Sequence, residues 1–488
     1  MPVLLFGAIF LFLALQAEGQ NKKGWIVDFP GIGIHSSPRT ADLNGDGIKD
    51  IIVGCGKKEF EKTETGMMAV DGATGEVLWR VPARDQIFGS AALLDINKDG
   101  IPDIVIGGRA AELKAINGRT GEVIWEFLSE GNKNKPRKQG WFNFYNPQVI
   151  PDQNEDGIED ILVTNGGDIM VPPYDPNRPA GNLLIIDGCN GKVIAKAQVP
   201  DGRETYMSVV ISKMHPDDDD LTIIFGTGGE TIGGNLYRTT LKEVMSENLS
   251  RAILLANSKD KGYIAPPVLC DLNQDGVLDI VANAVEGKIL AFNGKNNELL
   301  WENSIENTEA YASLAVGFFN DDHIPDIFTT FTEGVWPNLD QSRQIMINGK
   351  TGEIEFLDSL GILQTSSPVI ADFNNDGFDD GLQCVNFVGV EKMIFETYYT
   401  MLVVYDFHRQ STYQLTDYFP GINLSSTPWI GDLDEDGKLD VVYCYLTDTK
   451  SDTSMKGFRM VRLSLDTDIK QEVKWGAYMG SNYNGIFK

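Results

Sequence analysis

The feature that most constrains this chain is a nine-residue pattern, D-x-N/D-x-D-G-x-x-D, which recurs along its length. Intact copies begin at six positions: Asp42, Asp95, Asp152, Asp271, Asp372 and Asp432. Where copies adjoin, their starts lie 53, 57 and 60 residues apart. Self-similarity at a nearly fixed period of this size indicates a repeat architecture, in which each repeat is one supersecondary unit.

Two longer intervals each leave room for one degenerate copy. Residues 215–220 place four aspartates before a strand-like segment, and residues 318–326 keep the frame of the pattern. In the second of these copies, Phe318 replaces the first carboxylate and His323 replaces the glycine. We therefore expect eight units, and we expect the loop at 318–326 to bind no metal.

Each unit contains four short apolar runs separated by turns. The first run enters the acidic loop and the second leaves it, while the third ends in a turn of the kind found at 71–75, Asp-Gly-Ala-Thr-Gly. The fourth run often ends in a tryptophan, as at Trp79, Trp125 and Trp301. Four short antiparallel strands in each repeat are typical of a propeller blade. The sequence predicts an all-β fold, a single β-propeller over residues 20–488 with eight four-stranded blades, or seven as the alternative.

The acidic pattern has the donors of a calcium site. Side-chain oxygens at positions 1, 3, 5 and 9 converge when the glycine at position 6 allows a tight turn, and the carbonyl at position 7 adds another oxygen. Hard oxygen donors favour calcium over zinc or copper. The predicted calcium ligands are Asp42, Asn44, Asp46, Ile48, Asp50, Asp95, Asn97, Asp99, Ile101, Asp103, Asp152, Asn154, Asp156, Ile158, Asp160, Asp271, Asn273, Asp275, Val277, Asp279, Asp372, Asn374, Asp376, Phe378, Asp380, Asp432, Asp434, Asp436, Lys438 and Asp440.

The loops and their flanks resemble the FG-GAP/VCBS repeats of integrin α-subunit propellers, and Phe88-Gly89 matches the Phe-Gly pair of that family. The Thr-Gly turn followed by tryptophan is similar to the blades of quinoprotein-like (PQQ-like) propellers. The resemblance covers most of residues 30–488 and implies a propeller whose loop calcium is structural. It implies no particular partner.

Charge and the first residues of the chain suggest where the protein works. The formal net charge is -29, so an anionic nucleic acid is excluded as a partner. The apolar run near the start, with small residues at Ala17 and Gly19, predicts a signal peptide over 1–19, with an uncleaved anchor as the alternative. We expect a secreted, periplasmic or cell-surface protein with no transmembrane segment in the mature chain. The five cysteines are expected to be small buried residues without disulfides.

The sequence favours a binding or scaffold module for a protein or glycan partner, and no enzyme. The chain has four histidines and lacks an adjacent cysteine pair, a CxxCH haem site, GxSxG, HExxH and a P-loop. A propeller-fold enzyme that acts on carbohydrate through carboxylates is the alternative.

One segment between repeats is a candidate for the partner surface. Residues 141–147 form the densest group of aromatics, and residues 133–138, which precede them, are basic. Exposed tryptophan and tyrosine are typical anchors of interfaces. The alternative is that these aromatics seal blades two and three together.

Overall fold

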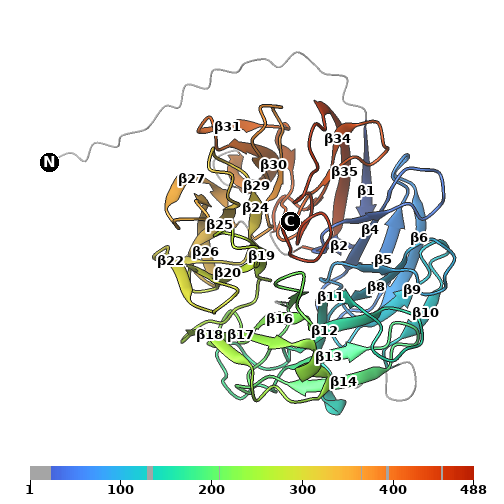
Figure 1. Ribbon diagram of the computed structural model, residues 1–488. Coiled ribbons are helices and arrows are strands. Elements are labelled where there is room, and N and C mark those ends of the chain that lie inside the picture. The colour runs from blue at the N-terminus through green and yellow to red at the C-terminus, as the bar shows by residue number, and fades with distance from the viewer. Residues whose placement is uncertain (1–23, 129–135, 208, 364, 392–394, 452–453) are drawn as a thin grey trace.

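The computed structural model describes residues 24–128, 136–207, 209–363, 365–391, 395–451 and 454–488. In this part of the chain the strands form eight antiparallel blades arranged in a ring (Figure 1). The predicted all-β, eight-bladed propeller is confirmed, and the alternative of seven blades is wrong. The predicted signal peptide over 1–19 lies outside the described residues.

The first four blades follow one another along the chain. Blade one contains β2 (Gly33–Ile34), β3 (Arg39–Ala41), β4 (Asp50–Gly56), β5 (Thr63–Val70) and β6 (Val77–Ala83), and blade two contains β7 (Ala92–Leu94), β8 (Asp103–Gly107), β9 (Leu113–Ile116) and β10 (Val123–Glu126). Blade three contains β11 (Asn143–Ile150), β12 (Asp160–Gly166), β13 (Asn182–Ile186) and β14 (Val193–Gln198), and blade four contains β15 (Val210–Ser212), β16 (Thr222–Gly226), β17 (Gly234–Thr240) and β18 (Ile253–Ser258).

The other four blades complete the ring. Blade five contains β19 (Val268–Cys270), β20 (Asp279–Ala284), β21 (Lys288–Phe292) and β22 (Leu299–Ser304), and blade six contains β23 (Thr308–Glu309), β24 (Ala315–Gly317), β25 (Asp326–Val335), β26 (Asn338–Ile347) and β27 (Ile354–Ile362). Blade seven contains β28 (Val369–Ala371), β29 (Asp380–Glu391), β30 (Phe395–Asp406), β31 (Ser411–Gln414) and β32 (Phe419–Pro420). Blade eight contains β33 (Trp429–Gly431), β34 (Lys438–Leu446), β35 (Gly457–Asp468) and β1 (Gly24–Pro30). A 3-10 helix, η1 (Pro136–Gln139), and an α-helix, α1 (Leu241–Met245), lie in connections between strands.

Blade eight joins the two ends of the repeat region. Its outer strand, β1, comes from the beginning of the described chain and pairs with β35, with Gly24 opposite Leu463 and Pro30 opposite Gly457. Figure 1 shows the blue β1 beside the red β35. The main-chain hydrogen bonds of this pair close the ring.

Burial along the strands explains why these segments form blades. Central strands such as β4, β8 and β16 are buried throughout, because both of their faces pack on neighbouring blades. Outer strands such as β6 and β14 alternate buried and exposed residues. The clusters of buried side chains join adjacent blades. Ile51 and Met68 of blade one, for example, pack with Val442 and Phe458 of blade eight.

Residues 473–488 cross the middle of the ring, which the repeat pattern did not predict. Main-chain hydrogen bonds hold this segment to the inner strands. Ile370 donates its N–H to the Trp475 carbonyl, and Phe487 donates its N–H to the Leu269 carbonyl, at 2.9 Å in each case. Trp475 is almost fully buried. Figure 1 shows the C-terminal label at the centre of the ring.

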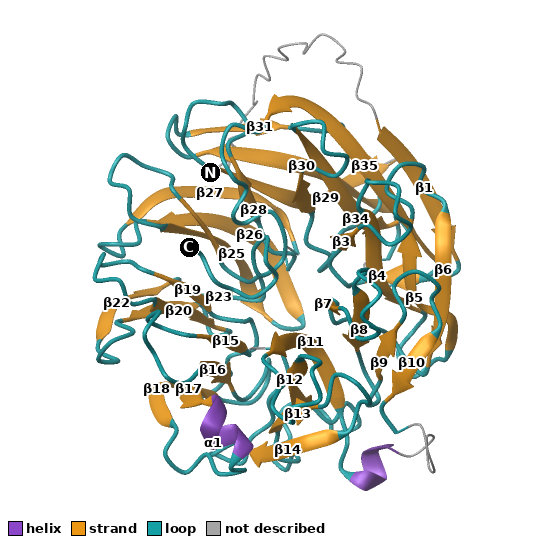
Figure 2. Cartoon of the chain, turned by 45° about the vertical axis from the view of Figure 1, so that its right-hand side comes forward, coloured by secondary structure: helices purple, strands orange, loops and turns teal. Residues whose placement is uncertain are grey.

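The connections divide between the two ends of the propeller. We call the end with the acidic loops the loop face; there each loop joins the first and second strands of a blade. We call the opposite end the mouth face; it carries the connections between blades and the turns between second and third strands. Figure 2 shows these connections in teal. None of the described helices combines the length and apolar character that a membrane crossing needs.

All five cysteines are free, as predicted. Four of them are also buried, as predicted. Cys189 is exposed, because it lies in the turn between β13 and β14. The expectation that it is a buried residue is wrong.

Candidate functional site

The acidic loops share one backbone conformation. In the first loop, Asp42 accepts the N–H groups of Gly45 (2.7 Å) and Gly47 (3.0 Å), and Asp46 accepts that of Ile48 (2.8 Å). Gly47 has φ of +85°, the left-handed region that glycine tolerates best. The side chains at positions 1, 3 and 5 therefore all accept N–H groups of their own loop.

The aspartate at position 9 also ties the loop to the rest of its blade. Asp50 accepts the Leu43 N–H at 2.9 Å through one oxygen and the Gly72 N–H at 3.0 Å through the other. Gly72 belongs to the turn between the third and fourth strands. Asp103, Asp160, Asp279 and Asp326 make the same pair of contacts in their blades. Position 9 thus clamps two turns together.

The turn between third and fourth strands contributes a group that sequence analysis did not assign to the loops. Asp71, the first residue of that turn, accepts a hydrogen bond from the Asn44 side chain at 3.0 Å, and Asp406 accepts one from Asn374 at 3.0 Å. In blade three, ligand atoms of Asp187 and Cys189 lie within 4.8 Å of one from Asp156. The Asp or Asn at the start of each of these turns was the sequence signal that could have predicted this contribution to the loops.

The degenerate loop at 318–326 keeps the conformation without the first carboxylate. His323 has φ of +56° where the intact loops have glycine, and Asp322 accepts the Ile324 N–H at 2.8 Å. The loop conformation alone is therefore no measure of metal binding. What distinguishes the intact loops is the additional carboxylate.

The loop of blade eight brings three carboxylates closest together. Ligand oxygens of Asp432, Asp434 and Asp440 lie within 4.8 Å of one another, and Oδ1 of Asp434 is buried without a hydrogen-bond partner. Such a donor set fits calcium. Arg462 of β35 already contacts two of these groups, with Nη2 2.5 Å from Asp434 and 3.1 Å from Asp440.

The electrostatics of the other intact loops also fit a cation. Burial raises the pKa of Asp50 and of Asp279 to about 6, although backbone N–H groups oppose this shift. Burial, followed by the charge of Asp406, raises the pKa of Asp380 to about 8. A bound cation would relieve this unfavourable negative charge.

The mouth face has a cavity of about 400 Å³ where blades one, two and three meet. Its apolar walls come from Phe60, Trp141, Phe142, Ile169 and Met170. The ion pair between Arg137 and Asp168 (2.6 Å) stands at the same cavity. Size and lining suit a side chain of a partner.

The structure divides the aromatic segment 141–147 between the two predicted roles. Trp141 is partly exposed and lines the cavity together with Phe142 and Asn143, whereas the six residues after Trp141 are buried. Phe144 packs edge-to-face on Phe127, 4.9 Å between ring centres, and so seals blade two to blade three. The sealing interpretation is confirmed for most of the segment. Residues 133–135 of its basic lead-in lie outside the described residues.

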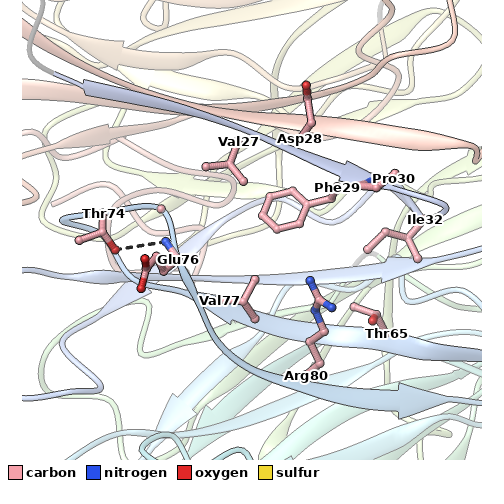
Figure 3. A pocket seen from close by; sticks show the side chains of 11 residues that line it. Val27, Asp28, Phe29, Pro30, Ile32, Thr65, Thr74, Glu76, Val77 and Arg80 are labelled. Atoms are coloured by element: carbon pink, nitrogen blue, oxygen red, sulfur yellow. Dashed lines mark hydrogen bonds between the residues drawn. The ribbon is translucent and has the colours of Figure 1, made fainter.

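A second cavity, of about 480 Å³, lies along the seam between β1 and β6. Figure 3 shows Phe29 and Arg80 directed into the gap, while Asp28 points away from it. Asp28 pairs with Arg459 at 2.6 Å, and Phe29 belongs to the core between blades eight and one. The walls of this cavity are thus part of the ring closure.

The comparisons with known proteins point to one family. A model of the FAM234A/B β-propeller matches residues 45–372, more than half of the chain. FAM234B of Homo sapiens is 29% identical over 146 residues, which cover 28% of this chain and 21% of that protein. FAM234A of Bos taurus is 28% identical over 201 residues, which cover 35% of this chain and 34% of that protein. The chain thus matches a fifth to a third of the length of these relatives.

Solved structures agree on the fold. A europium-containing methanol dehydrogenase aligns over 90% of this chain and 92% of its own with a TM-score of 0.57, at 11% identity. A quinohemoprotein alcohol dehydrogenase from Comamonas testosteroni aligns over 90% and 76% with a TM-score of 0.54, also at 11% identity. At this identity the likeness concerns the fold alone. It agrees with the quinoprotein-like blades predicted above.

The predicted membership of the FG-GAP/VCBS family is wrong, because the matching family is a different propeller family. The acidic loop is a short connection between the first and second strands of a blade. It therefore specifies a turn, and a turn of this kind does not identify the whole propeller.

Proposed function

We propose that this chain, which belongs to the FAM234A/B β-propeller family, is a binding module that holds a protein partner on its mouth face. The observation that carries the proposal is the cavity beside Trp141, where three blades supply apolar side chains to one opening. Met170 is 58% exposed and Phe60 is 57% exposed at this cavity. Large apolar groups left in solvent beside a cavity are typical of interaction sites.

The lining favours a protein over a glycan. Phe60, Ile169 and Met170 offer apolar and flexible contacts, which suit an aliphatic or aromatic side chain. The Arg137–Asp168 pair adds a polar edge that can orient a peptide. We propose binding without catalysis for this site.

Calcium is proposed as a structural ion of the six intact loops on the opposite face. Support comes from the three clustered carboxylates of the blade-eight loop and from the raised pKa values of Asp50, Asp279 and Asp380. Outside the cell calcium is plentiful, and extracellular modules bind it with Kd values of about 10⁻⁴ to 10⁻³ M. A secreted or cell-surface location is proposed for the same reason.

A paired screen tests the partner class. Phage-displayed peptides and a glycan array are screened against the purified chain, and the Kd values of selected ligands are measured for Met170→Ser and Phe60→Ser. Leu254→Ser, 54% exposed on the outer strand β18, is the matched control. We expect the two cavity variants to weaken the selected peptides about tenfold or more, as for interface anchors. Glycans that need Met170, or peptides that ignore both variants, would overturn the proposal.

A further inference from the structure

A ring of equivalent residues surrounds the axis on the mouth face. Each of them stands seven residues before the acidic loop of its blade. In seven blades this residue stands four positions before the innermost strand, and in blade three, where that strand begins at Asn143, it lies within β11. The residues at this position, here called the mouth ring, are His35, Phe88, Tyr145, Tyr206, Ile264, Tyr311, Thr365 and Ser425. Five of the eight are aromatic, whereas the positions that follow are small or proline in most blades.

Ring contacts connect consecutive blades. His35 stacks on Phe88 with 4.4 Å between ring centres, and Tyr145 meets Phe88 at 6.3 Å and Tyr206 at 6.2 Å. Ser425 of blade eight lies 3.0 Å from the His35 ring nitrogen. Beneath the ring, Asn146 donates to the Tyr478 hydroxyl at 3.3 Å, so residues 473–488 form its floor.

Glu230 brings a carboxylate to this ring. It lies in the turn between β16 and β17, where Lys261 donates to its backbone carbonyl at 2.7 Å. A side chain at the neighbouring Gly229 would meet the Tyr206 hydroxyl, and Lys261 also pairs with Glu309, which accepts the Tyr311 hydroxyl at 2.5 Å. The Glu230 residue is partly exposed.

The neighbouring charges leave Glu230 without a partner. Arg109 pairs with Glu59 at 2.6 Å, Arg178 with Glu204 at 3.1 Å and Lys261 with Glu309 at 2.5 Å. Among the described residues, none donates a hydrogen bond to the Glu230 carboxylate or forms an ion pair with it. Burial, and then the charge of Glu309, raise the pKa of this carboxyl.

We propose that the mouth ring binds a small organic cation of the alkylammonium or quaternary ammonium class, with Glu230 as its counter-ion. Aromatic faces attract such cations, and several rings around one cation are a common way to bind quaternary ammonium groups. The partly exposed Tyr206 and Tyr311 supply these faces, while the Glu230 carboxylate supplies the missing charge. This site is distinct from the cavity beside Trp141 and does not depend on it.

Choline is the probe, and its neutral carbon isostere, 3,3-dimethylbutan-1-ol, is the matched control ligand. Binding is measured by titration calorimetry at fixed ionic strength in calcium-saturated buffer, so that the acidic loops do not compete. We expect saturable binding of choline at least tenfold tighter than binding of the isostere. Glu230→Gln should remove this preference, and Tyr311→Leu should weaken choline about tenfold.

Glu353→Gln controls for the loss of one negative charge. Glu353 is exposed in the turn before β27 on the loop face, far from the mouth ring in the blade. Circular dichroism verifies that each variant is folded. Absence of saturable choline binding, equal affinity for choline and the isostere, or equal losses in Glu230→Gln and Glu353→Gln would each overturn the proposal.

Discussion

The guanidinium carbon of Arg39 lies 4.1 Å from the ring centre of Tyr483, although the two residues stand near opposite ends of the sequence. Arg39 also donates from Nη1 to the Tyr478 carbonyl at 2.7 Å and from Nε to the Ala91 carbonyl at 3.2 Å. It is only 2% exposed. A side chain on the inner strand of blade one thus adds to the main-chain bonds that hold the segment crossing the ring.

Arg39→Met should therefore destabilise the protein by about 2 to 4 kcal/mol, because buried carbonyls lose charged donors worth about 1.5 to 3 kcal/mol each. Denaturant unfolding measures the change. Arg343→Met is the control, since Arg343 pairs with Glu333 near the surface and such pairs contribute about 1 kcal/mol or less. Equal losses in both variants would contradict the role of Arg39.

Calcium should raise Tm through the intact loops. At free calcium ten times the Kd, each site contributes about 1.4 kcal/mol, so six independent sites contribute about 8 kcal/mol. Asp275→Ala should reduce the calcium-dependent rise in Tm. Asp322→Ala removes the same backbone contact in the degenerate loop, because Asp275 accepts the Val277 N–H as Asp322 accepts that of Ile324. It should leave the calcium-dependent rise unchanged, and an equal reduction would contradict the assignment.

Arg462 should make the loop of blade eight the least dependent on calcium. Its guanidinium contacts Asp434 and Asp440 and also donates to the Gly72 carbonyl of blade one at 3.0 Å. Arg462→Met should cost about 3 to 5 kcal/mol without calcium, as when one partner leaves a buried ion pair. Calcium should restore part of this loss, which differential scanning calorimetry can measure.

Lys456→Met is the control for Arg462→Met, since Lys456 is exposed and pairs with Asp448 at 3.2 Å. Its effect should stay within about 1 kcal/mol. If calcium stabilised Arg462→Met no more than the unmodified chain, Arg462 would not be acting as the cation of that loop.

His35 should make the protein less stable in mild acid. Burial, and then the charge of Arg109, lower the pKa of His35 from 6.5 to about 3. The unfolded chain therefore binds a proton at a higher pH than the folded chain does, so the stabilising contribution is complete above pH 6.5. It is lost as pH falls from 6.5 toward 3, by about 2 kcal/mol at pH 5.

The measurement compares the unfolding free energy of the unmodified chain and His35→Gln between pH 7 and pH 5. Buried aspartates with raised pKa values make the folded state more stable as the pH falls, which is the opposite effect. Both chains contain these aspartates, so their contribution cancels in the comparison. The unmodified chain should lose about 2 kcal/mol more than His35→Gln over this range. Parallel curves would show that His35 is not protonated on unfolding.

The ring of blades could be predicted because the repeat defines both the structure of one blade and the number of blades. Asp50 and its equivalents mark where the second strand begins in six blades, and the glycine turn at 71–75 marks the next hairpin. Even the degenerate copy with Phe318 kept its place in this series. The path of residues 473–488 could not be predicted, because the segment carries no repeat and its contacts are with inner strands distant in sequence.

The candidate site was harder to predict for a similar reason. The acidic loops drew attention to the loop face, whereas the cavity and the mouth ring lie on the other end. Trp141 was found from local composition, but Phe60 comes from a turn of blade one and Met170 from the turn between β12 and β13, and both meet it only in the fold. Glu230 lies in a glycine-rich turn whose sequence, read alone, predicts no ligand.

Because β1 pairs with β35, blade eight can be completed only late in translation. Gly24 leaves the ribosome long before its partner Leu463, about 440 residues later. At roughly 5 to 20 residues per second, β1 waits about 20 to 90 s for the strand that completes its blade. During that time its apolar residues, Phe29 among them, have no partner in blade eight. The nascent chain therefore exposes an unpaired strand for most of its translation, and chaperones that shield such edges are expected to act on this protein early.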